Sequence, residues 1–138
     1  SRLFRRLREE LGLAYSIYSY FTNHLGGGIF TIAAGISPSA KKQALSEIDS
    51  VLNGLLDGIS PEELERAKNQ ASAGLAMGYE NSYNLAMDMG RREILGLPQR
   101  TERKSQALIA SVTLEAVKEI AQQTLSVKPA YCFAGKLK

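Results

Sequence analysis

The sequence has little of two residue types on which metal and nucleophilic sites are usually built. It contains one histidine, His24, and one cysteine, Cys132, among 138 residues. A catalytic zinc site normally takes two or three nitrogen ligands from the protein, so it cannot be assembled here. A Ser-His-Asp or Cys-His arrangement would depend on His24, which sits in a glycine-rich turn without rigid support. We therefore interpret His24 as a solvated turn residue.

A single cysteine also excludes an internal disulfide, and nothing indicates an oxidising compartment. Cys132 lies between Tyr131 and Phe133, and we expect it to be a small buried hydrophobe in a strand, not a nucleophile. No apolar run approaches the ~18 residues of a membrane span, so we expect no membrane partner. The chain begins with Ser1, without an initiator Met and already in a helical pattern. We interpret it as a fragment of a longer protein from the bacterial cytoplasm, with a mitochondrial or secreted origin as alternatives.

The excess of positive over negative side chains is also slight. Lys and Arg number 17 and Asp and Glu 14, which leaves a net charge of +3. Nucleic-acid binding domains usually gather basic residues on one face. Here the only basic cluster is a run of four arginines between residues 2 and 8, and two glutamates follow it at once. We expect no nucleic-acid partner, which would show itself by salt-dependent DNA binding.

What is present is the pattern of an α+β domain. A composition of 44% hydrophobic and 22% charged residues suits one globular domain, and we take residues 1–138 as that domain. Apolar residues at helical spacing predict an amphipathic helix over residues 1–11. β-favouring residues predict strands over 13–22 and 29–36. The glycine-rich segment Asn23–Gly28 predicts the turn of an antiparallel hairpin.

Helices are predicted over most of the remaining chain. Ser37-Pro38 begins a helix that ends at Gly58. The segment Ser60–Glu63 has the form of a capping box and starts a helix that runs to about Tyr79. Further predicted elements are a helix over 82–95, two helices capped by Thr101 and Thr113, and a closing strand over 130–134. This order favours an α+β fold with helices packed on one face of an antiparallel sheet.

One pair of side chains suggests chemistry. On a helical wheel Arg8 lies nearest the apolar stripe between Leu7 and Leu11, so it is predicted to be the most sheltered of the four arginines, whereas Arg2 points away. Tyr15 follows on the next strand, and a helix that turns back into a strand would bring the guanidinium and the phenol to one surface. Both are strong donors that together would stabilise an oxyanion. A partly buried Arg and a strand Tyr are more often structural, so the residues alone favour a structural role, with the catalytic role as the alternative.

Several segments resemble one protein family. Ser1–Ser16 resembles the hallmark segment of the C-terminal homologous domain of pitrilysin/insulinase-type (inverzincin) zinc metallopeptidases, which include mitochondrial processing peptidase and small bacterial zinc peptidases. Ile59–Gln70 resembles the family's mid-domain helix start, and Gly90–Gly96 resembles its next helix. Ser111–Val117 and the closing strand also fit. The first segment is the most specific, and together the segments span nearly the whole chain in order.

The resemblance implies a zinc metalloendopeptidase of two homologous halves that close like a clamshell around a peptide. One half carries zinc on an inverted His-x-x-Glu-His motif and a distal Glu, and zinc with the motif's Glu activates the attacking water. The other half contributes an Arg and a Tyr that hold substrate and polarise the scissile carbonyl. In this sequence they fall on Arg8 and Tyr15. The zinc motif and the strand and helix that normally precede the hallmark segment are missing, so we expect a metalloprocessing-peptidase-like domain truncated at its N-terminus.

We therefore expect the C-terminal, substrate-clamping half of a zinc metallopeptidase, inactive alone. Its partners would be a peptide substrate and an N-terminal zinc-bearing half or subunit, and its cofactor would be zinc bound outside this chain. The alternative is a non-catalytic scaffold or partner-binding subunit of the same family, in which Arg8 and Tyr15 would be relics or substrate holders. A truncation that exposed a sheet edge or an apolar groove would also favour a homo-oligomer.

Overall fold

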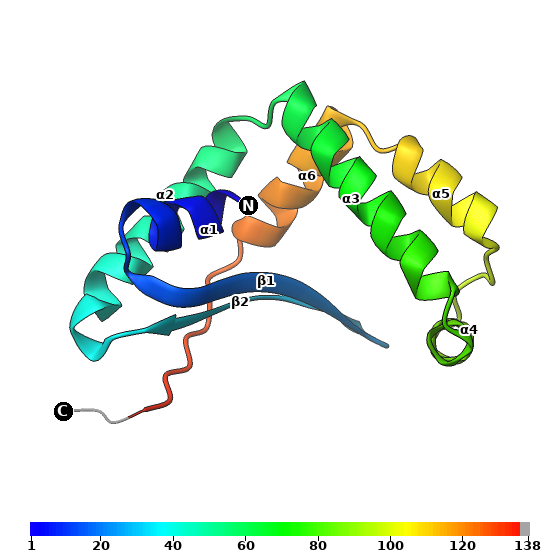
Figure 1. Cartoon of the computed structure of the whole chain (residues 1–138), viewed down its shortest axis with the longest axis horizontal. Coiled ribbons are helices and arrows are strands. Elements are labelled where there is room, and N and C mark those ends of the chain that lie inside the picture. The colour runs from blue at the N-terminus through cyan, green and yellow to red at the C-terminus, as the bar shows by residue number, and fades with distance from the viewer. Residues whose placement is uncertain (136–138) are drawn as a thin grey trace. The chain divides into compact units, whose positions relative to one another are not determined.

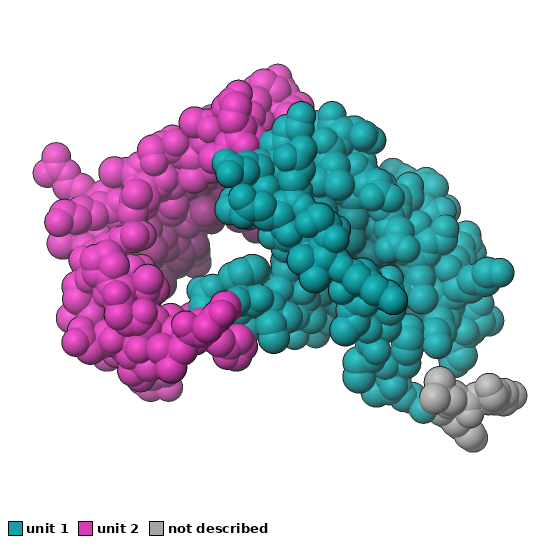
Figure 2. Space-filling view, turned by 180° about the vertical axis from the view of Figure 1, so that it is seen from behind, with its two compact units in different colours: residues 1–23, 28–58, 118–138 teal, residues 24–27, 59–117 magenta. Residues whose placement is uncertain are grey.

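The computed structural model describes residues 1–135 and has an α+β fold made of one antiparallel hairpin and a series of helices (Figure 1). The chain forms two compact units (Figure 2). Unit 1 contains residues 1–23, 28–58 and the chain from 118 on, and unit 2 contains residues 24–27 and 59–117. Folding as one domain stays a prediction. Within the described residues no helix is both long and apolar enough to cross a membrane.

Unit 1 places helices against one face of a two-stranded sheet, as the sequence predicts. Its elements are α1 (Arg2–Phe4), the π-helical η1 (Arg5–Glu10), β1 (Ala14–His24), β2 (Gly27–Ile36), the 3₁₀-helix η2 (Pro38–Ala40) and α2 (Lys41–Asp57), except that the last residue of β1 and the first of β2 belong to unit 2. Helix α6 (Leu114–Leu125) has residues in both units.

The core of unit 1 joins the first helix to the hairpin and to α2. Its buried residues are Leu3, Leu7, Ala14, Ile17 and Ala44. The partly buried residues packed against them are Phe4, Ile32, Ile36, Ile48 and Val51. Leu7 is completely buried, with 0% of its surface exposed. Truncating such a leucine to alanine typically costs about 2–5 kcal/mol, so Leu7 is the strongest single anchor of η1.

The first helix departs from the regular α-helix that its apolar spacing predicts. Only Arg2–Phe4 is α-helical, and Arg5–Glu10 winds as a π-helix. The Leu11 N–H donates to the Arg6 carbonyl, five residues back, at 3.2 Å. A π turn holds more residues than an α turn, so its side chains leave the positions of a wheel drawn at about 100° per residue.

Arg2, which the wheel directs away from the core, reaches the C-terminal end of α2. Its guanidinium donates to the carbonyl oxygens of Gly54 at 2.7 Å and Gly58 at 2.9 Å. The last carbonyls of a helix lack partners within the helix and carry partial negative charge, so a cation there is stabilising. The prediction for Arg2 is wrong because these acceptors belong to another helix, which a wheel does not include.

Arg6 joins η1 to α2 by an ion pair. Its Nε donates to the Glu47 carboxylate at 2.8 Å, and its Nη1 donates to Glu10 at 3.0 Å. These two carboxylates, Glu47 more than Glu10, raise the pKa of the guanidinium above its ordinary value. The Arg6 side chain is 42% exposed, so water screens the pair and keeps its contribution to stability small.

The hairpin turn is tighter than its glycines suggest. β1 and β2 are joined by Leu25 and Gly26 alone, so the predicted turn over residues 23–28 is too long at both ends. Gly28 lies within β2, where an added Cβ would collide with the Phe21 ring. This glycine therefore allows an aromatic ring to cross the neighbouring strand closely, and it does not turn the chain.

The predicted closing strand over residues 130–134 does not form. The sheet of the described residues contains only β1 and β2, and a strand requires a partner for its ladder of hydrogen bonds. Rings and a cation hold the segment instead. Tyr131 stacks on Phe133 with 6.3 Å between ring centroids, and Lys41 Nζ lies 3.6 Å from the centre of the Phe133 ring. Cys132 is exposed, which corrects the expected buried position.

The helices of unit 2 begin at side-chain caps, three of which the sequence predicts; the fourth is Asn81, whose Oδ1 accepts from the Tyr83 N–H at 2.9 Å. They are α3 (Pro61–Tyr79), α4 (Ser82–Ile94), α5 (Glu102–Ala110) and the first residues of α6. The capping box is confirmed, because Ser60 Oγ accepts from the Glu63 N–H at 3.2 Å while the Ser60 N–H donates to the Glu63 carboxylate at 3.1 Å. Thr101 and Thr113 also accept the predicted capping bonds, at 3.3 and 3.2 Å.

Polar contacts to backbone carbonyls supplement the packing of α3 against α5. Lys68 Nζ on α3 donates to the carbonyl of Ala110, the last residue of α5, at 3.0 Å. Gln106 Nε2 on α5 donates to the Ser72 carbonyl on α3 at 3.1 Å. Both bonds run between the two helices, so they fix the position of α5 along α3.

Ser60→Ala should lower the free energy of unfolding of unit 2 by about 1 kcal/mol, because the Glu63 N–H loses its acceptor. Urea denaturation followed by circular dichroism measures the loss. The Ser60 hydroxyl also lowers the pKa of Glu62 below its ordinary value of 4.5. That stabilisation is present above pH 4.5 and is lost as the pH falls through the folded-state pKa, so the deficit should narrow in acid. Asn69→Ala, at an exposed interior position of α3, is the control, and an equal loss in both variants would contradict the capping role.

Glu47→Gln should lower the free energy of unfolding of unit 1 by a small amount, because it removes the charge that pairs with Arg6. High salt should reduce this loss, since the pair is screened by water and ions. Denaturation at low and high salt, in a double-mutant cycle with Arg6→Gln, measures the pairwise part. Glu9→Gln changes an exposed carboxylate on η1 and serves as the control. If the loss in free energy of unfolding is the same at low and high salt, the charge is not what stabilises the contact.

Candidate functional site

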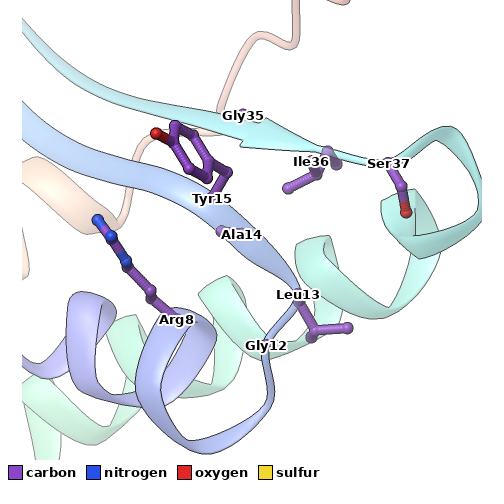
Figure 3. A pocket seen from close by; sticks show the side chains of 8 residues that line it. All are labelled: Arg8, Gly12, Leu13, Ala14, Tyr15, Gly35, Ile36 and Ser37. Carbon is purple, nitrogen blue, oxygen red and sulfur yellow. The ribbon is translucent and has the colours of Figure 1, made fainter.

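A shallow pocket opens in unit 1 where η1 passes into β1. It has a volume of about 560 Å³ and is lined by Arg8, Gly12, Leu13, Ala14, Tyr15, Gly35, Ile36 and Ser37 (Figure 3). η1 supplies the only charged side chain of this lining, the start of β1 supplies the phenol, and the end of β2 supplies the opposite wall. Both residues singled out in the sequence therefore line one pocket.

Gly12 makes the reversal that brings Arg8 to Tyr15. Its φ of +59° lies in the left-handed region, which glycine adopts without steric cost. The Leu13 N–H closes the turn by donating to the Leu7 carbonyl at 2.8 Å. The guanidinium carbon of Arg8 then lies 5.6 Å from the centre of the Tyr15 ring, within the range of a cation–π contact. Figure 3 shows the two side chains extending toward the same side of the view.

Arg8 and Tyr15 are open to solvent, which corrects the predicted shelter of Arg8. Arg8 is exposed and Tyr15 is 85% exposed, whereas Arg2 and Arg6 are partly buried. The π-helical winding and the acceptors on α2 together cause this reversal, because they draw in Arg2 and Arg6 and leave Arg8 at the surface. A tyrosine this exposed contributes little to the core. Its position suits contact with another molecule better than support of the fold.

The charge of Arg8 is not neutralised by any carboxylate of the described residues. Within residues 1–135 its guanidinium contacts the rings of Phe4, at 5.1 Å, and Tyr15, and it makes no ion pair or hydrogen bond. Arg5 of the same helix, by contrast, lies 3.8 Å from Glu10. A ring face does not satisfy guanidinium N–H donors as a carboxylate does, so these donors remain available to the oxygen of a ligand.

The described residues do not fit a zinc ion. In residues 1–135 no group of three or more His, Cys, Asp or Glu side chains could hold a metal, whereas protein zinc sites use three or four such ligands. His24, at the end of β1, is exposed. Cys132, in the segment after α6, is exposed as well. The chemistry of the pocket is therefore that of hydrogen-bond donors and a cation.

Phe4 and the β2 wall of the pocket are candidates that sequence reasoning does not identify. Phe4 precedes Arg8 by four residues, a spacing that stacks side chains on one helical face, so a signal for it exists. The β2 wall, made of Gly35 and Ile36 with Ser37 after the strand end, reaches the site through the hairpin register. That register brings Gly35 opposite Ser16, where an added Cβ would lie 3.0 Å from the Ser16 Oγ. It depends on the two-residue turn, which glycine content alone does not predict.

Comparison with protein families matches residues 1–71 to the peptidase M16 inactive domain. This match runs from α1 into α3 and includes the pocket. A zinc protease of Streptomyces coelicolor is 33% identical over 139 residues, which cover 100% of this chain and 30% of that relative. The zinc protease YmxG of Bacillus subtilis is 34% identical over 124 residues, which cover 89% of this chain and 30% of that relative. The chain thus spans 30% of the length of each of these two relatives.

Two solved structures share the fold. The peptidase M16 inactive domain from Pseudomonas fluorescens has a TM-score of 0.78 and 25% sequence identity, over 89% of this chain and 29% of that chain. The periplasmic protease PqqL from Escherichia coli has a TM-score of 0.72 and 23% identity, over 91% of this chain and 14% of that chain. These findings confirm the resemblance to pitrilysin/insulinase-type zinc peptidases. The chain belongs to the peptidase M16 family and matches its inactive domain.

Proposed function

We propose that this chain is the substrate-clamping half of a zinc-dependent metalloendopeptidase, with zinc supplied by a separate N-terminal half. The observation that carries the proposal is the pair formed by Arg8, which has no carboxylate partner in residues 1–135, and the exposed Tyr15. The pair lies inside the segment that matches the family. The relatives' description as zinc proteases supports the reaction class, and since this chain spans 30% of their length, the activity would belong to a longer protein.

The chemistry of the pair suits a peptide carbonyl. When water attacks that carbonyl, its oxygen becomes an oxyanion, and donors already placed at the oxygen lower the barrier. Arg8 offers a permanent positive charge with up to five N–H donors, and Tyr15 offers one O–H donor. Their separation of 5.6 Å from guanidinium carbon to ring centre lets both address one peptide unit. Leu13 and Ile36 in the pocket lining would contact an apolar substrate side chain.

Zinc would be bound by residues outside this chain, because residues 1–135 offer no set of ligands for it. Every role proposed here for this chain is therefore binding and orientation of the peptide. Alone, the chain would bind no catalytic zinc and would hydrolyse no peptide. A location in the bacterial cytoplasm stays a prediction, and the structural neighbour PqqL is described as periplasmic.

A non-catalytic scaffold or partner-binding subunit is the second candidate function. The family's description as an inactive domain favours it. In that case neither the longer protein that contains this chain nor its neighbouring gene product would carry His-x-x-Glu-His. Sequencing the surrounding gene separates the two functions, since a clamping half requires a zinc-bearing partner.

Arg8→Ala and Tyr15→Phe should each lower kcat/KM of the intact enzyme by ~10²-fold, comparable to the loss of one oxyanion donor. The measurement is hydrolysis of an internally quenched peptide that the wild-type enzyme cleaves, with zinc content checked in each variant. Arg5→Ala, on the same helix, and Tyr18→Phe, on the same strand, are matched controls and should keep nearly full activity. Unchanged kcat/KM in both site variants would refute the assigned roles.

A further inference from the structure

We infer that Phe4 is a positioning residue for Arg8, whose guanidinium it holds at the mouth of the pocket. The guanidinium carbon lies 5.1 Å from the centre of the Phe4 ring and 5.6 Å from that of Tyr15, so two rings contact one cation. Both distances lie within the range of favourable cation–π contacts. The inference rests on the proposed function, because it assigns to Phe4 a role that acts through Arg8.

Phe4 itself has a fixed position. It is partly buried and packs against the buried core of unit 1 that contains Leu3 and Leu7. Its backbone N–H donates to the Ser1 Oγ at 3.2 Å, which caps the start of α1. The ring is therefore held from the core side, while Tyr15 is 85% exposed and has no comparable support. Of the two rings, Phe4 is the one that can act as a fixed surface for the cation.

Arg8 needs such a surface because its side chain is long and has several rotatable bonds. The other arginines near it are held by polar acceptors, Arg6 by Glu47 and Arg2 by the carbonyls at the end of α2. A carboxylate at Arg8 would fix the side chain equally well, but it would also neutralise the charge and occupy its donors. An aromatic face limits the rotamers and leaves charge and donors for a ligand. The Phe4 ring thus preorganises Arg8 and leaves its charge and N–H donors available.

The competing explanation is that Phe4 only fills the core. Phe4→Leu separates the two explanations, because leucine keeps an apolar side chain and removes the ring face. Positioning predicts that Phe4→Leu lowers kcat of the full-length enzyme about two- to fivefold with little change in KM, as expected for the loss of one exposed cation–π contact. Phe4→Tyr keeps the ring and should retain kcat. Phe4→Met is a second ring-free variant and should behave like Phe4→Leu.

The decisive comparison uses Arg8→Ala as background, with the same internally quenched peptide. If Phe4 acts through Arg8, Phe4→Leu should have no further effect on kcat once Arg8 is absent. Phe21→Leu removes another partly exposed ring, on β1 and away from the pocket lining, and should leave kcat unchanged. An equal loss from Phe4→Leu in both backgrounds, or no recovery in Phe4→Tyr, would overturn the inference.

A spectroscopic signal tests the same contact without any activity. In the ¹⁵N-arginine-labelled full-length protein, the Arg8 Nε–Hε resonance should lie upfield because of the ring currents of Phe4 and Tyr15. Phe4→Leu should move it toward the position of a solvated arginine, and Phe4→Tyr should not. If this shift is seen but Arg8→Ala leaves kcat/KM unchanged, the contact stands and the proposed function fails. If Arg8→Ala lowers kcat/KM and Phe4→Leu does not move the Arg8 resonance, the positioning role fails and the proposed function stands.

Discussion

The complete burial of Leu7 against the hairpin and α2 determines where η1 lies, and the site depends on that position. Truncating such a side chain would cost about 2–5 kcal/mol, whereas water screens the partly buried Arg6–Glu47 ion pair and keeps its contribution small. The apolar contact therefore fixes the helix, and the polar contacts only orient the side chains it carries. Arg8 is the next residue after Leu7 in the chain, so the same contact that anchors the helix places the cation at the pocket.

Four arginines within eight residues acquire four different environments, and the difference comes from the groups that each one meets. Arg2 meets carbonyl oxygens, Arg6 meets two carboxylates, Arg5 approaches one carboxylate, and Arg8 meets two rings. Carbonyl oxygens accept hydrogen bonds from the guanidinium, and carboxylates also neutralise its charge. An aromatic ring leaves most of the charge and the N–H donors available. Most arginines of this basic cluster, which resembles a nucleic-acid patch by composition, therefore have polar partners within unit 1. A single available guanidinium remains beside a phenol.

Features that depend on local chemistry could be predicted from the sequence, and features that depend on a distant partner could not. The capping box at Ser60 and the caps at Thr101 and Thr113 involve neighbours within three residues, and all are confirmed. The meeting of Arg8 and Tyr15 was accessible because one short segment contains both. The reach of Arg2 to α2 and the absence of strand pairing over residues 130–134 depend on elements far along the chain, which periodicity does not report.

Because η1 is wound as a π-helix, the number of residues in this segment matters for the site as well as their types. An α-helix has fewer residues per turn than a π-helix, so it would reach the turn at Gly12 with fewer residues. Deleting Glu9 would keep the buried Leu7 and the Arg8 cation, and it would change the number of residues between Arg8 and the turn at Gly12. The segment therefore acts as a spacer, and its length in residues sets the position of the Arg8 guanidinium relative to the Tyr15 phenol.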